Sequence, residues 1–592
     1  MVRGRIVYYG LGTLGVGAVG FHQFMSYQFG DDALPRLLTA YKTAIPAFSA
    51  YRMVQFKYDT APKKLAKLLS WIDKDLPEKY GIKPNEEEAS KQYEELHKIW
   101  APKMYAAFLE LRGFYIKTGQ MIANNIGDAA PPYWQKVCDP LLDKVPPKDF
   151  TYVRATIEKE LNSKLEDIFE SFDPTPLASA SIGQVHKAKL RKSGHSVVVK
   201  VMYPEVEAQF RGDVATSKFF VRFALPEQLP ALNEIEKQFA NEFDYQREAQ
   251  QLATVRKNLL VHAAPEFDHL IIPAPITEYC TKRVLVMDEV PNAEKLTTAL
   301  DRDMKSFAKD KNVSIDDLLE EERRLNKEFL AKGQLRCGPT AKEMEAFITY
   351  RKWYNRLTYP LQLLGIKKAQ HIPLNHAKLV DELFRIHGYE ILVDGAFNGD
   401  PHPGNLLLSY PDDERSASHV RLALVDYGQV KVLTPEQRLK FARLIVALAK
   451  CDHPEIVQQR KKNTTTNNAT LATKEEEERH NKAKQLVVKR MSEMDFRTKQ
   501  NDPEVIFRLA QLYFDRDDRI ATEGMHIQEY IEYLSGIDPV DKLNDDYVMI
   551  GRCALMLRGL GHALNQHRSA ALAWLPLAQQ VLRNAGENPD AE

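Results

Sequence analysis

The sequence feature that most constrains the fold is a pair of short strand patterns, the second of which ends in a lysine. Residues 174–201 contain a turn and two apolar runs, and the second run, Val197-Val198-Val199, leads directly into Lys200. A turn at Lys192-Ser-Gly194 would join the two runs as an antiparallel pair. Short continuous apolar runs are consistent with buried strands. We therefore expect a small antiparallel sheet that carries a lysine at one strand end.

Most of the remaining chain has helical periodicity, and its length of 592 residues exceeds what one hydrophobic core usually supports. Two or more lobes are therefore expected. A tract from Asn463 to Glu478 has too little apolar content to pack, and we predict disorder over residues 460–482. The other expected elements are helices within 34–69, 86–125, 232–260 and 376–389 and from residue 435 onward, a helical insertion at 301–372, a strand at 283–287, and a hairpin with arms 406–408 and 420–425.

Composition excludes some classes of function. Hydrophobic residues make up 44% and charged residues 27% of the chain, which is usual for globular proteins. The 81 basic and 81 acidic side chains cancel, so the strong positive field of a nucleic-acid-binding protein is absent, and we expect no DNA or RNA partner. The five cysteines form no C-x-x-C pair, which indicates neither a zinc site nor a disulfide framework and favours a reducing compartment.

The first 30 residues look like a membrane or targeting segment. No acidic residue occurs before Asp31, and Arg3 and Arg5 precede the uncharged run from Ile6 to Phe21. Crossing a bilayer needs about 20 apolar residues. An acid-free, weakly basic start is typical of organelle targeting. We expect residues 1–30 to be an anchor or a targeting segment, with a secretory signal and a plain buried helix as alternatives.

A glycine-loop pattern precedes the lysine. Residues 178–185 have the frame of the G-x-G-x-x-G-x-V loop that covers the phosphates of ATP in protein kinases, with alanine at the first two glycine positions. Lys200 follows Val185 by 15 residues, where kinases carry their phosphate-binding lysine. A lysine at a strand end is more often a solvated edge residue, and the neighbouring motifs favour the functional interpretation.

Two later motifs supply oxygen ligands. Asp400-Pro-His-Pro-Gly-Asn405 has the D-x-x-x-x-N spacing of the kinase catalytic loop, in which the aspartate acts on the substrate and the asparagine binds magnesium. Asn398-Gly399 replaces the usual His-Arg before it. Asp426-Tyr427-Gly428 stands where kinases carry Asp-Phe-Gly, so Asp426 would be the main metal ligand. We interpret His402, between two prolines, as a structural hydrogen-bonding group.

Acidic residues complete the expected nucleotide site, which would hold ATP or ADP with Mg²⁺. Glu242 and Glu248 lie at the place of the kinase helix whose glutamate pairs with the strand lysine. On a single helix they would project about 120° apart, so we expect them to serve two different lysines. A solvated acidic face is the alternative. The expected nucleotide-binding residues are Ala178, Ser179, Ala180, Ser181, Gly183, Val185, Lys200, Glu242, Glu248, Met287 and Glu289, with Asn405 and Asp426 on the metal.

At these residues the sequence resembles the UbiB family, the atypical kinases with aarF domains, from about residue 101 to residue 450. Lys117-Thr118-Gly119-Gln120 matches the family's K-x-G-Q motif, residues 178–184 its alanine-rich loop, and Glu242-Phe-Asp244 its E-x-D motif. The loop departs from the family pattern by reading Ala-Ser-Ala-Ser, and the insertion at 301–372 is a second departure.

The resemblance implies that the K-x-G-Q helix covers the cleft where a protein substrate would otherwise bind. It implies that Lys117 and Gln120 reach into this cleft, and that Lys117 joins Lys200 and Asp400 as a catalytic residue. Lys117 would pair with Glu242 or Asp244, and Lys200 with Glu248. It also implies a link to coenzyme Q or other isoprenoid-lipid metabolism in mitochondria, plastids or bacteria.

We therefore predict an α+β, bilobal, protein-kinase-like fold with a small antiparallel sheet lobe, a helical large lobe and helical extensions at both ends. The expected regions are an anchor at 1–30, a helical region with the K-x-G-Q motif at 31–150, the small lobe at 151–300, the insertion at 301–372, the catalytic part of the large lobe at 373–450, and a C-terminal helical region at 451–592.

The predicted function is that of an atypical kinase or ATPase in isoprenoid-lipid or coenzyme Q metabolism at an organelle membrane. The expected location is the mitochondrion, at the inner membrane, with the plastid as the alternative. Expected partners are a nucleotide, a membrane lipid or quinone precursor, and a biosynthetic protein complex. One rival is a catalytically idle scaffold, which would not need Asp400, Asn405 and Asp426. The other is a protein Ser/Thr kinase, disfavoured because no long activation segment follows Gly428.

Overall fold

The computed structural model describes residue 26 and residues 32–124, 130–142, 144–224, 229–263, 265–410, 420–451 and 474–589. The chain forms two compact units, of which unit 1 comprises Met1–Gln246 and Thr277–Val286, and unit 2 comprises Arg247–Ile276 and Met287–Glu592. The predicted anchor at residues 1–30 lies outside the described residues, apart from residue 26. Within the described ranges, none of the helices has both the length and the hydropathy that crossing a membrane requires.

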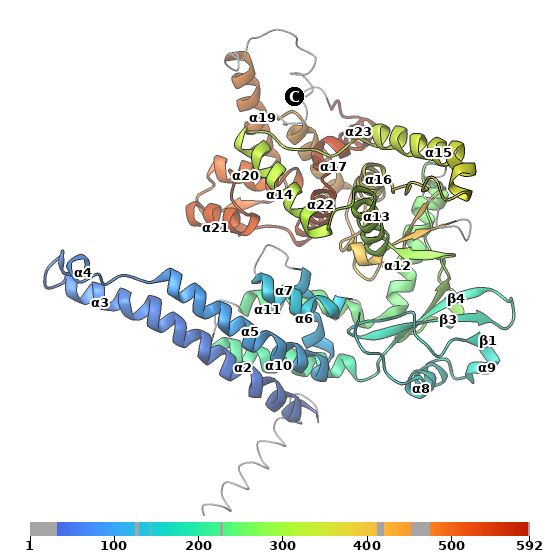
Figure 1. Ribbon diagram of the computed structural model, residues 1–592, viewed down its shortest axis with the longest axis horizontal. Coiled ribbons are helices and arrows are strands. Elements are labelled where there is room, and N and C mark those ends of the chain that lie inside the picture. Colours follow the sequence, from blue (N-terminus) through green and yellow to red (C-terminus); the bar gives the residue numbers. More distant parts are fainter. Residues whose placement is uncertain are drawn as a thin grey trace, which may run out of the picture. The chain divides into compact units, whose positions relative to one another are not determined.

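Unit 1 begins with long helices that pack against one another (Figure 1). Helix α2 lies along α5 and also contacts α10, to which an ion pair between Arg36 and Asp213 fastens it. The helices of this unit are α2 (Ala33–Gln55), α3 (Ala61–Ser70), α4 (Leu76–Lys79), α5 (Glu86–Leu111), α6 (Gly113–Asn124), α7 (Pro132–Cys138), α8 (Phe150–Leu161), α9 (Leu165–Ile168), α10 (Val206–Ala224) and α11 (Leu229–Ala240).

The helices expected within 86–125 are α5 and α6, and the break between them falls at Arg112. Arg112 and Gly113 both have positive φ, at 58° and 48°, and this left-handed backbone ends α5 at Leu111. Glycine adopts that conformation without strain, whereas the arginine is held in it by its surroundings. The guanidinium of Arg112 donates to the carbonyl of Pro146 at 3.0 Å. Apolar periodicity runs through the break, so the sequence pattern did not reveal it.

A mostly antiparallel sheet forms the other part of unit 1. Its strands are β1 (Phe169–Phe172), β2 (Ala178–Ser179), β3 (Gly183–Leu190), β4 (Ser196–Met202) and β5 (Val284–Asp288), in the order β1-β3-β4-β5 with β2 paired to β3. The predicted strands at 197–201 and 283–287 are confirmed, as is the turn between β3 and β4, where Gly194 has a φ of +65°. The register places Val185 opposite Lys200.

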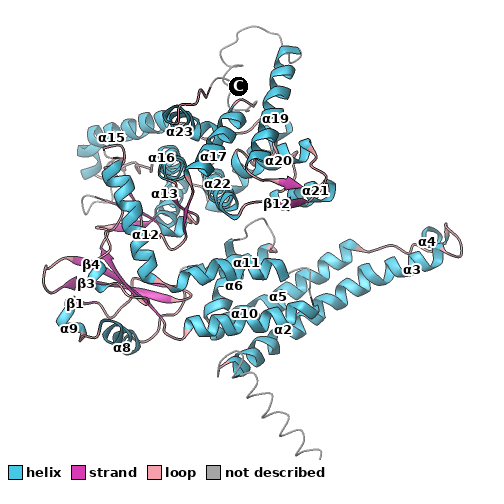
Figure 2. Cartoon of the chain, turned by 180° about the vertical axis from the view of Figure 1, so that it is seen from behind, coloured by secondary structure: helices cyan, strands magenta, loops and turns pink. Residues whose placement is uncertain are grey.

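Unit 2 is mainly helical and carries two small antiparallel sheets near the predicted catalytic loop (Figure 2). One sheet contains β6 (Ala293–Lys295), β8 (Leu406–Ser409) and β9 (Arg421–Leu424), and the other contains β7 (Ala396–Asn398) and β10 (Val430–Val432). The helices are α12 (Tyr245–Lys257), which begins in unit 1, α13 (Leu296–Lys311), α14 (Ile315–Ala331), α15 (Ala341–Leu363), α16 (His376–Tyr389), α17 (Pro435–Ala449), α19 (Lys474–Glu493), α20 (Pro503–Phe514), α21 (Ile527–Ile537), α22 (Asp545–Ala563) and α23 (Ala570–Asn584).

Several predictions for unit 2 are confirmed. The hairpin predicted at 406–425 is β8 and β9, with Leu406 opposite Leu424. Helix α16 spans the predicted residues, the insertion is helical through α13, α14 and α15, and α17 begins at Pro435. The start of α17 has a physical cause, because Thr434 and Gln437 form a capping box around the proline at the first helical turn. The α+β fold class is therefore confirmed.

One prediction for the C-terminal region, disorder over 460–482, is wrong where the structure describes the chain. The predicted disordered tract at 460–482 overlaps α19, which begins at Lys474; the earlier part of the tract lies outside the described residues. The helix packs against α17 and α20, and this tertiary contact stabilises a segment too polar to fold alone. The region is also not purely helical, since β11 (Arg497–Thr498) pairs with β12 (Val540–Lys542).

Candidate nucleotide site

The alanine-rich loop is the turn between β2 and β3 in unit 1. The amide of Ala180 donates to the carbonyl of Gly183 at 2.8 Å, which closes the turn, and Ala178 lies opposite Val185. Gly183 must be glycine, because a Cβ there would lie 2.3 Å from the carbonyl oxygen of Val201. Ser181 is buried and Ser179 and Ala180 are more accessible. The backbone therefore makes a tight turn of the kind that can approach phosphates closely.

Lys200 projects from β4 on the same face as Val185, its cross-strand neighbour. Its ammonium nitrogen lies 4.7 Å from the centre of the Tyr245 ring. The hydroxyl of Tyr245 in turn lies beside Gly183, 3.1 Å from where a Cβ would stand. Tyr245 thus links the lysine to the loop, and sequence reasoning missed it. The one available signal was its place directly after the E-x-D motif.

Lys117 on α6 is held by unit 1 on two sides. Its ammonium forms an ion pair with Glu242 at 3.2 Å and lies 4.8 Å from the centre of the Phe239 ring. Its side chain is 27% exposed and that of Glu242 is 17% exposed, so this is not a solvated helix lysine. The expected pairing of Lys117 with one of the two E-x-D carboxylates is confirmed, and the partner is Glu242.

The rest of the K-x-G-Q motif packs α6 against the turn that follows α7. The side-chain amide of Gln120 donates a hydrogen bond to the carbonyl of Leu141 at 2.8 Å. This bond holds α6 in place, and the role in the cleft that the family resemblance implies for Gln120 stays a prediction. A Cβ at Gly119 would lie 2.2 Å from Leu141 Cδ1 and 2.9 Å from Phe108 Cδ2. Glycine is therefore required here by close packing.

In unit 2, Asn398 joins the two predicted motif loops. Its side-chain oxygen accepts from the amide of Asp400 at 3.0 Å, and its side-chain nitrogen donates to the carbonyl of Asp426 at 2.9 Å. Asn398 is buried at the end of β7. Asn398 and Gly399 stand where ordinary kinases carry His-Arg. The two hydrogen bonds of Asn398 hold the backbone of Asp400 close to the backbone of Asp426. The sequence pattern alone shows this replacement but indicates no role for it.

Behind Asn398 lies a buried polar cluster centred on Glu390. One carboxylate oxygen accepts from the hydroxyl of Tyr427 at 3.2 Å, and the other lies 2.8 Å from Nδ1 of His387 and 3.4 Å from the amide of Asn398. Burial and the charge of Glu390 raise the pKa of Tyr427 well above its usual value, so the phenol stays protonated. The tyrosine that follows Asp426 is therefore a fixed donor that anchors the loop.

The carboxylates of Asp426 and Glu248 both lie beside Gly428. The amide of Gly428 donates to Oδ1 of Asp426 at 3.0 Å. A Cβ at Gly428 would lie 3.4 Å from this oxygen and 3.7 Å from Oε2 of Glu248. No group of three or more His, Cys, Asp or Glu side chains forms a metal cluster in the described part of the chain. Mg²⁺ needs fewer, because it is usually bound through one or two carboxylates with water and phosphate oxygens. The oxygen donors present fit that requirement.

Asp400 has a partner that sequence reasoning did not find. Arg552 on α22 forms an ion pair with Asp400 at 3.2 Å, with the two side chains 25% and 22% exposed. No short motif marks this arginine, which lies 152 residues after Asp400. His402 accepts a hydrogen bond from the amide of Gly404 through Nδ1 at 3.0 Å and caps the short turn to Asn405. The structural interpretation of His402 is thus confirmed.

The predicted site residues are divided between the two units. Unit 1 holds the alanine-rich loop, Lys200, Lys117 and Glu242, whereas unit 2 holds Glu248, Asp400, Asn405 and Asp426 together with Met287 and Glu289 at the end of β5. Met287 is buried and pairs with Pro275. A pairing of Lys200 with Glu248 would join the units and stays a prediction.

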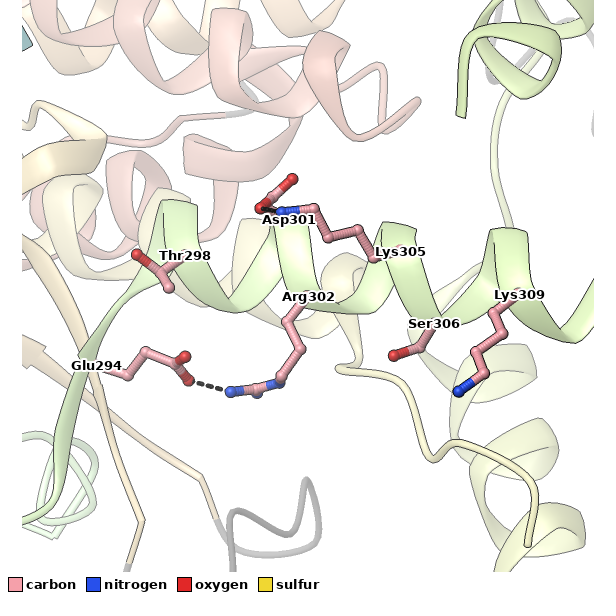
Figure 3. A pocket seen from close by; sticks show the side chains of 7 residues that line it. All are labelled: Glu294, Thr298, Asp301, Arg302, Lys305, Ser306 and Lys309. Carbon is pink, nitrogen blue, oxygen red and sulfur yellow. Dashed lines mark hydrogen bonds and ion pairs between the residues drawn. The ribbon is translucent and has the colours of Figure 1, made fainter. Parts of the chain in front are cut away.

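A hollow of about 420 Å³ lies along α13 (Figure 3). Arg302 projects from the helix toward Glu294, with which it forms an ion pair, and also donates to the hydroxyl of Tyr410 at 3.0 Å. Lys305 on the same helix pairs with Asp301. Its basic groups are thus largely matched by acidic ones, and none of the predicted nucleotide residues lines it.

Comparison with known proteins supports the motif assignments at the level of the domain. Residues 140–320 and 359–460 match the ABC1 atypical kinase-like domain. Over 204 residues the chain is 35% identical to the "Probable protein kinase UbiB" of Vibrio cholerae. The aligned stretch covers 33% of this chain and 36% of that protein. It is 34% identical over 193 residues to the protein of the same name from Aeromonas hydrophila. That alignment covers 31% of this chain and 34% of the relative. The chain thus matches about a third of the length of these curated relatives.

A solved structure of the Rv3197–erythromycin complex from Mycobacterium tuberculosis aligns with 85% of this chain and 99% of that chain, at 17% identity and a TM-score of 0.38. A likeness at that score supports no further argument. The domain match and the curated relatives carry the assignment, and the matched residues include Lys200, Asp400 and Asp426. The chain therefore carries an ABC1 atypical kinase-like domain and, over about a third of its length, is similar to proteins named UbiB.

Proposed function

We propose that this protein binds ATP with Mg²⁺ and acts as an atypical kinase or ATPase. The observation that carries the proposal is the carboxylate pair in unit 2: Asp426 and Glu248 both lie beside Gly428. Asn398 fastens the same segment to Asp400, so the proposed metal ligand and the proposed catalytic aspartate are held by one buried side chain. Bound Mg²⁺ would neutralise charge on the transferred phosphate, and the protein's part is to orient these oxygens.

The lysine residues of unit 1 supply the complementary charge. Lys200 and the tight alanine-rich turn are the groups expected to face phosphate oxygens, and Lys117 adds a second ammonium that is already fixed by Glu242. Lysine binds phosphate as a compact point charge and does not need the planar geometry of arginine.

Phosphorylation of proteins is the less favoured activity, although the curated relatives carry the name of protein kinases. After Gly428 the chain enters β10, which pairs with β7, and Thr434 then caps α17. This short connection leaves no room for an activation segment of the kind that docks a peptide. A small acceptor such as a quinone precursor or another isoprenoid lipid fits better, in coenzyme Q or related metabolism at an organelle membrane, of which the mitochondrial inner membrane is the first candidate.

The first test is Asp426→Asn, which removes the charge of the proposed metal ligand and keeps its shape. We expect magnesium-dependent nucleotide binding, measured by calorimetric titration with and without Mg²⁺, to be lost. Asp541→Asn, at an exposed position of β12, is the matched control and should bind like the parent.

Unchanged magnesium-dependent affinity in Asp426→Asn would exclude this site. If the parent itself binds no nucleotide, the catalytically idle scaffold becomes the better interpretation. Repeating the titration and a turnover assay with vesicles, and with vesicles that contain a quinone precursor, separates an ATPase that only senses the lipid from an enzyme that uses it.

A further inference from the structure

Helix α15 in the insertion carries a row of large apolar side chains on its surface. They recur at spacings of three and four residues, which places them along one side of the helix through its C-terminal end. Trp353 is 57% exposed, Leu357 73% and Leu364 71%. Contiguous exposure of large apolar groups marks an interaction surface rather than ordinary surface composition. We call this row the outer stripe; it consists of Tyr350, Trp353, Leu357, Leu361 and Leu364.

The opposite side of the N-terminal half of α15 is already packed. Met344 and Ile348 are buried, and Arg351 forms an ion pair with Asp310 of α13 at 2.9 Å. After the helix the chain turns back, and Asn355 exchanges two hydrogen bonds of 2.7 Å with the backbone of Gln370. Both views place α15 at the edge of the helices of unit 2 (Figures 1 and 2). The outer stripe is therefore a second apolar face, which folding of the unit leaves uncovered among the described residues.

The segment that carries the stripe has charged side chains of one sign only, lysine and arginine. Residues 346–380 contain no aspartate or glutamate, while six lysine and arginine residues occur there: Arg351, Lys352, Arg356, Lys367, Lys368 and Lys378. The guanidinium of Arg356 lies over the Trp353 ring, 5.8 Å from its centre. Lys367 and Lys368 are exposed and directly follow Ile366, which is 63% exposed. Among the described residues, Arg351 forms an ion pair with Asp310.

We propose that the outer stripe of α15 docks on the surface of an anionic membrane, with the helix lying in the interface. Tryptophan, tyrosine and leucine on one face with flanking lysine and arginine are the composition of helices that bind there. The aromatic rings and leucines would enter the boundary of the acyl chains, and the basic side chains would reach the lipid phosphates. The family match is interrupted at residues 321–358, so most of α15 is an addition to the matched domain.

The proposal does not depend on nucleotide binding, and the two can fail separately. The test is flotation of the full chain with vesicles of phosphatidylcholine alone and with vesicles that also contain phosphatidylglycerol. The parent should float with the anionic vesicles. The triple variant Trp353→Ser, Leu357→Ser, Leu364→Ser should partition at least about tenfold less, because each exposed apolar group loses its burial in lipid. The double variant Lys367→Glu, Lys368→Glu should lose about fivefold or more for each lysine.

Matched controls change the same chemistry elsewhere on unit 2. Tyr533→Ser removes an aromatic side chain that is 44% exposed on α21, and Lys482→Glu with Lys499→Glu makes the same change in charge at exposed positions. These variants should float like the parent. All variants should have the same thermal unfolding midpoint as the parent, which shows that they are folded and keeps this test separate from the test of Asp426.

Residues 1–30 could also hold the chain to vesicles, so the contact is located with a label. Leu357→Cys is combined with Cys337→Ser, which removes the exposed native cysteine, and carries a polarity-sensitive dye. The dye emission should shift to the blue with anionic vesicles and not with phosphatidylcholine alone. Absence of that shift, or parental flotation by the triple variant, overturns the proposal. A stripe variant that loses a co-purifying protein while its flotation is unchanged would overturn it in favour of a protein interface.

Discussion

Lys117 lies between an acidic and an aromatic side chain, and this position restricts what it can do. Its ion pair with Glu242 is 3.2 Å long, and the Phe239 ring beside it limits the rotamers that the lysine can adopt. A lysine used only for solubility would not be confined in this way. Confinement lowers the conformational entropy that is lost when the ammonium binds a phosphate.

We predict that Lys117→Ala changes nucleotide turnover by about tenfold or more, which corresponds to ~1.4 kcal/mol of transition-state free energy. The effect on the free energy of unfolding should stay near 1 kcal/mol, since one partly exposed ion pair is lost. Steady-state turnover and thermal unfolding measure the two effects. Lys42→Ala, at an exposed position of α2, should change neither. Equal turnover in Lys117→Ala and the parent would leave the lysine with only a structural role.

Asp394 provides a test of pH dependence. Burial and the charge of Glu390 raise the pKa of Asp394 from 3.8 to about 7, with Arg438 partly opposing the shift. One carboxylate oxygen of Asp394 is buried and has no hydrogen-bond partner among the described residues. The folded state therefore holds the proton that the unfolded state releases near its ordinary pKa. The protonated Asp394 therefore contributes to the free energy of unfolding. This stabilising contribution is complete below pH 3.8, falls as the pH rises, and is lost above about pH 7.

Asp394→Asn keeps the shape of the side chain and cannot lose a proton in this range. We predict that the variant gains stability relative to the parent between pH 5 and pH 8, by ~2 kcal/mol at most once partial solvent screening is allowed for. Denaturant unfolding at the two pH values measures the difference. Parallel stability profiles for parent and variant would show that the Asp394 carboxyl is not held protonated by the fold.

At the scale of elements, the K-x-G-Q motif works by bringing α6 close to its neighbours. Gly119 lies against Leu141 and Phe108, which belong to a buried cluster with Cys138. The break between α5 and α6 at Arg112 turns the second helix into this contact. The position of Lys117 thus depends on a glycine two residues away and on a backbone conformation five residues before it.

We predict that Gly119→Ala lowers the free energy of unfolding by about 1–3 kcal/mol, because the added methyl group overlaps a filled core. Gly559→Ala is the control, since that glycine lies exposed within α22 and a Cβ there meets nothing within 4 Å. This control should be stabilised by about 1 kcal/mol through helix propensity. Denaturant midpoints measure both changes. If both variants shift in the same direction, close packing does not explain the glycine in the motif.

At the scale of the whole molecule, the predicted site residues fall in both units. Unit 1 contains Lys117, Lys200 and the tight turn, and unit 2 contains Glu248, Asp426 and the predicted catalytic aspartate, Asp400. Each half is internally held, by Tyr245 and Glu242 in unit 1 and by Asn398 and Glu390 in unit 2. Helix α15 adds a surface to unit 2 that uses none of these groups.

The sequence alone determined the local elements and the chemistry of the motifs. Apolar runs and turn residues predicted β4, the hairpin of β8 and β9, and α16, because alternation, helical periodicity and capping are local signals. The order of Lys200, Asp400, Asn405 and Asp426 predicted the kinase-like class, which the domain match confirms. Roles that depend on residue type and spacing can be inferred in this way.

Only the tertiary structure decided which distant groups meet. Three contacts near the predicted site depend on chain segments that fold back from elsewhere: Lys200 with Tyr245, Asn398 with Asp426, and Asp400 with Arg552. The helical state of α19 depends in the same way on its packing against α17 and α20. The exposure of the outer stripe of α15 is of the same kind. Helical spacing predicts that these apolar residues share a face, but whether that face is buried depends on which of the two sides of the helix packs against the unit.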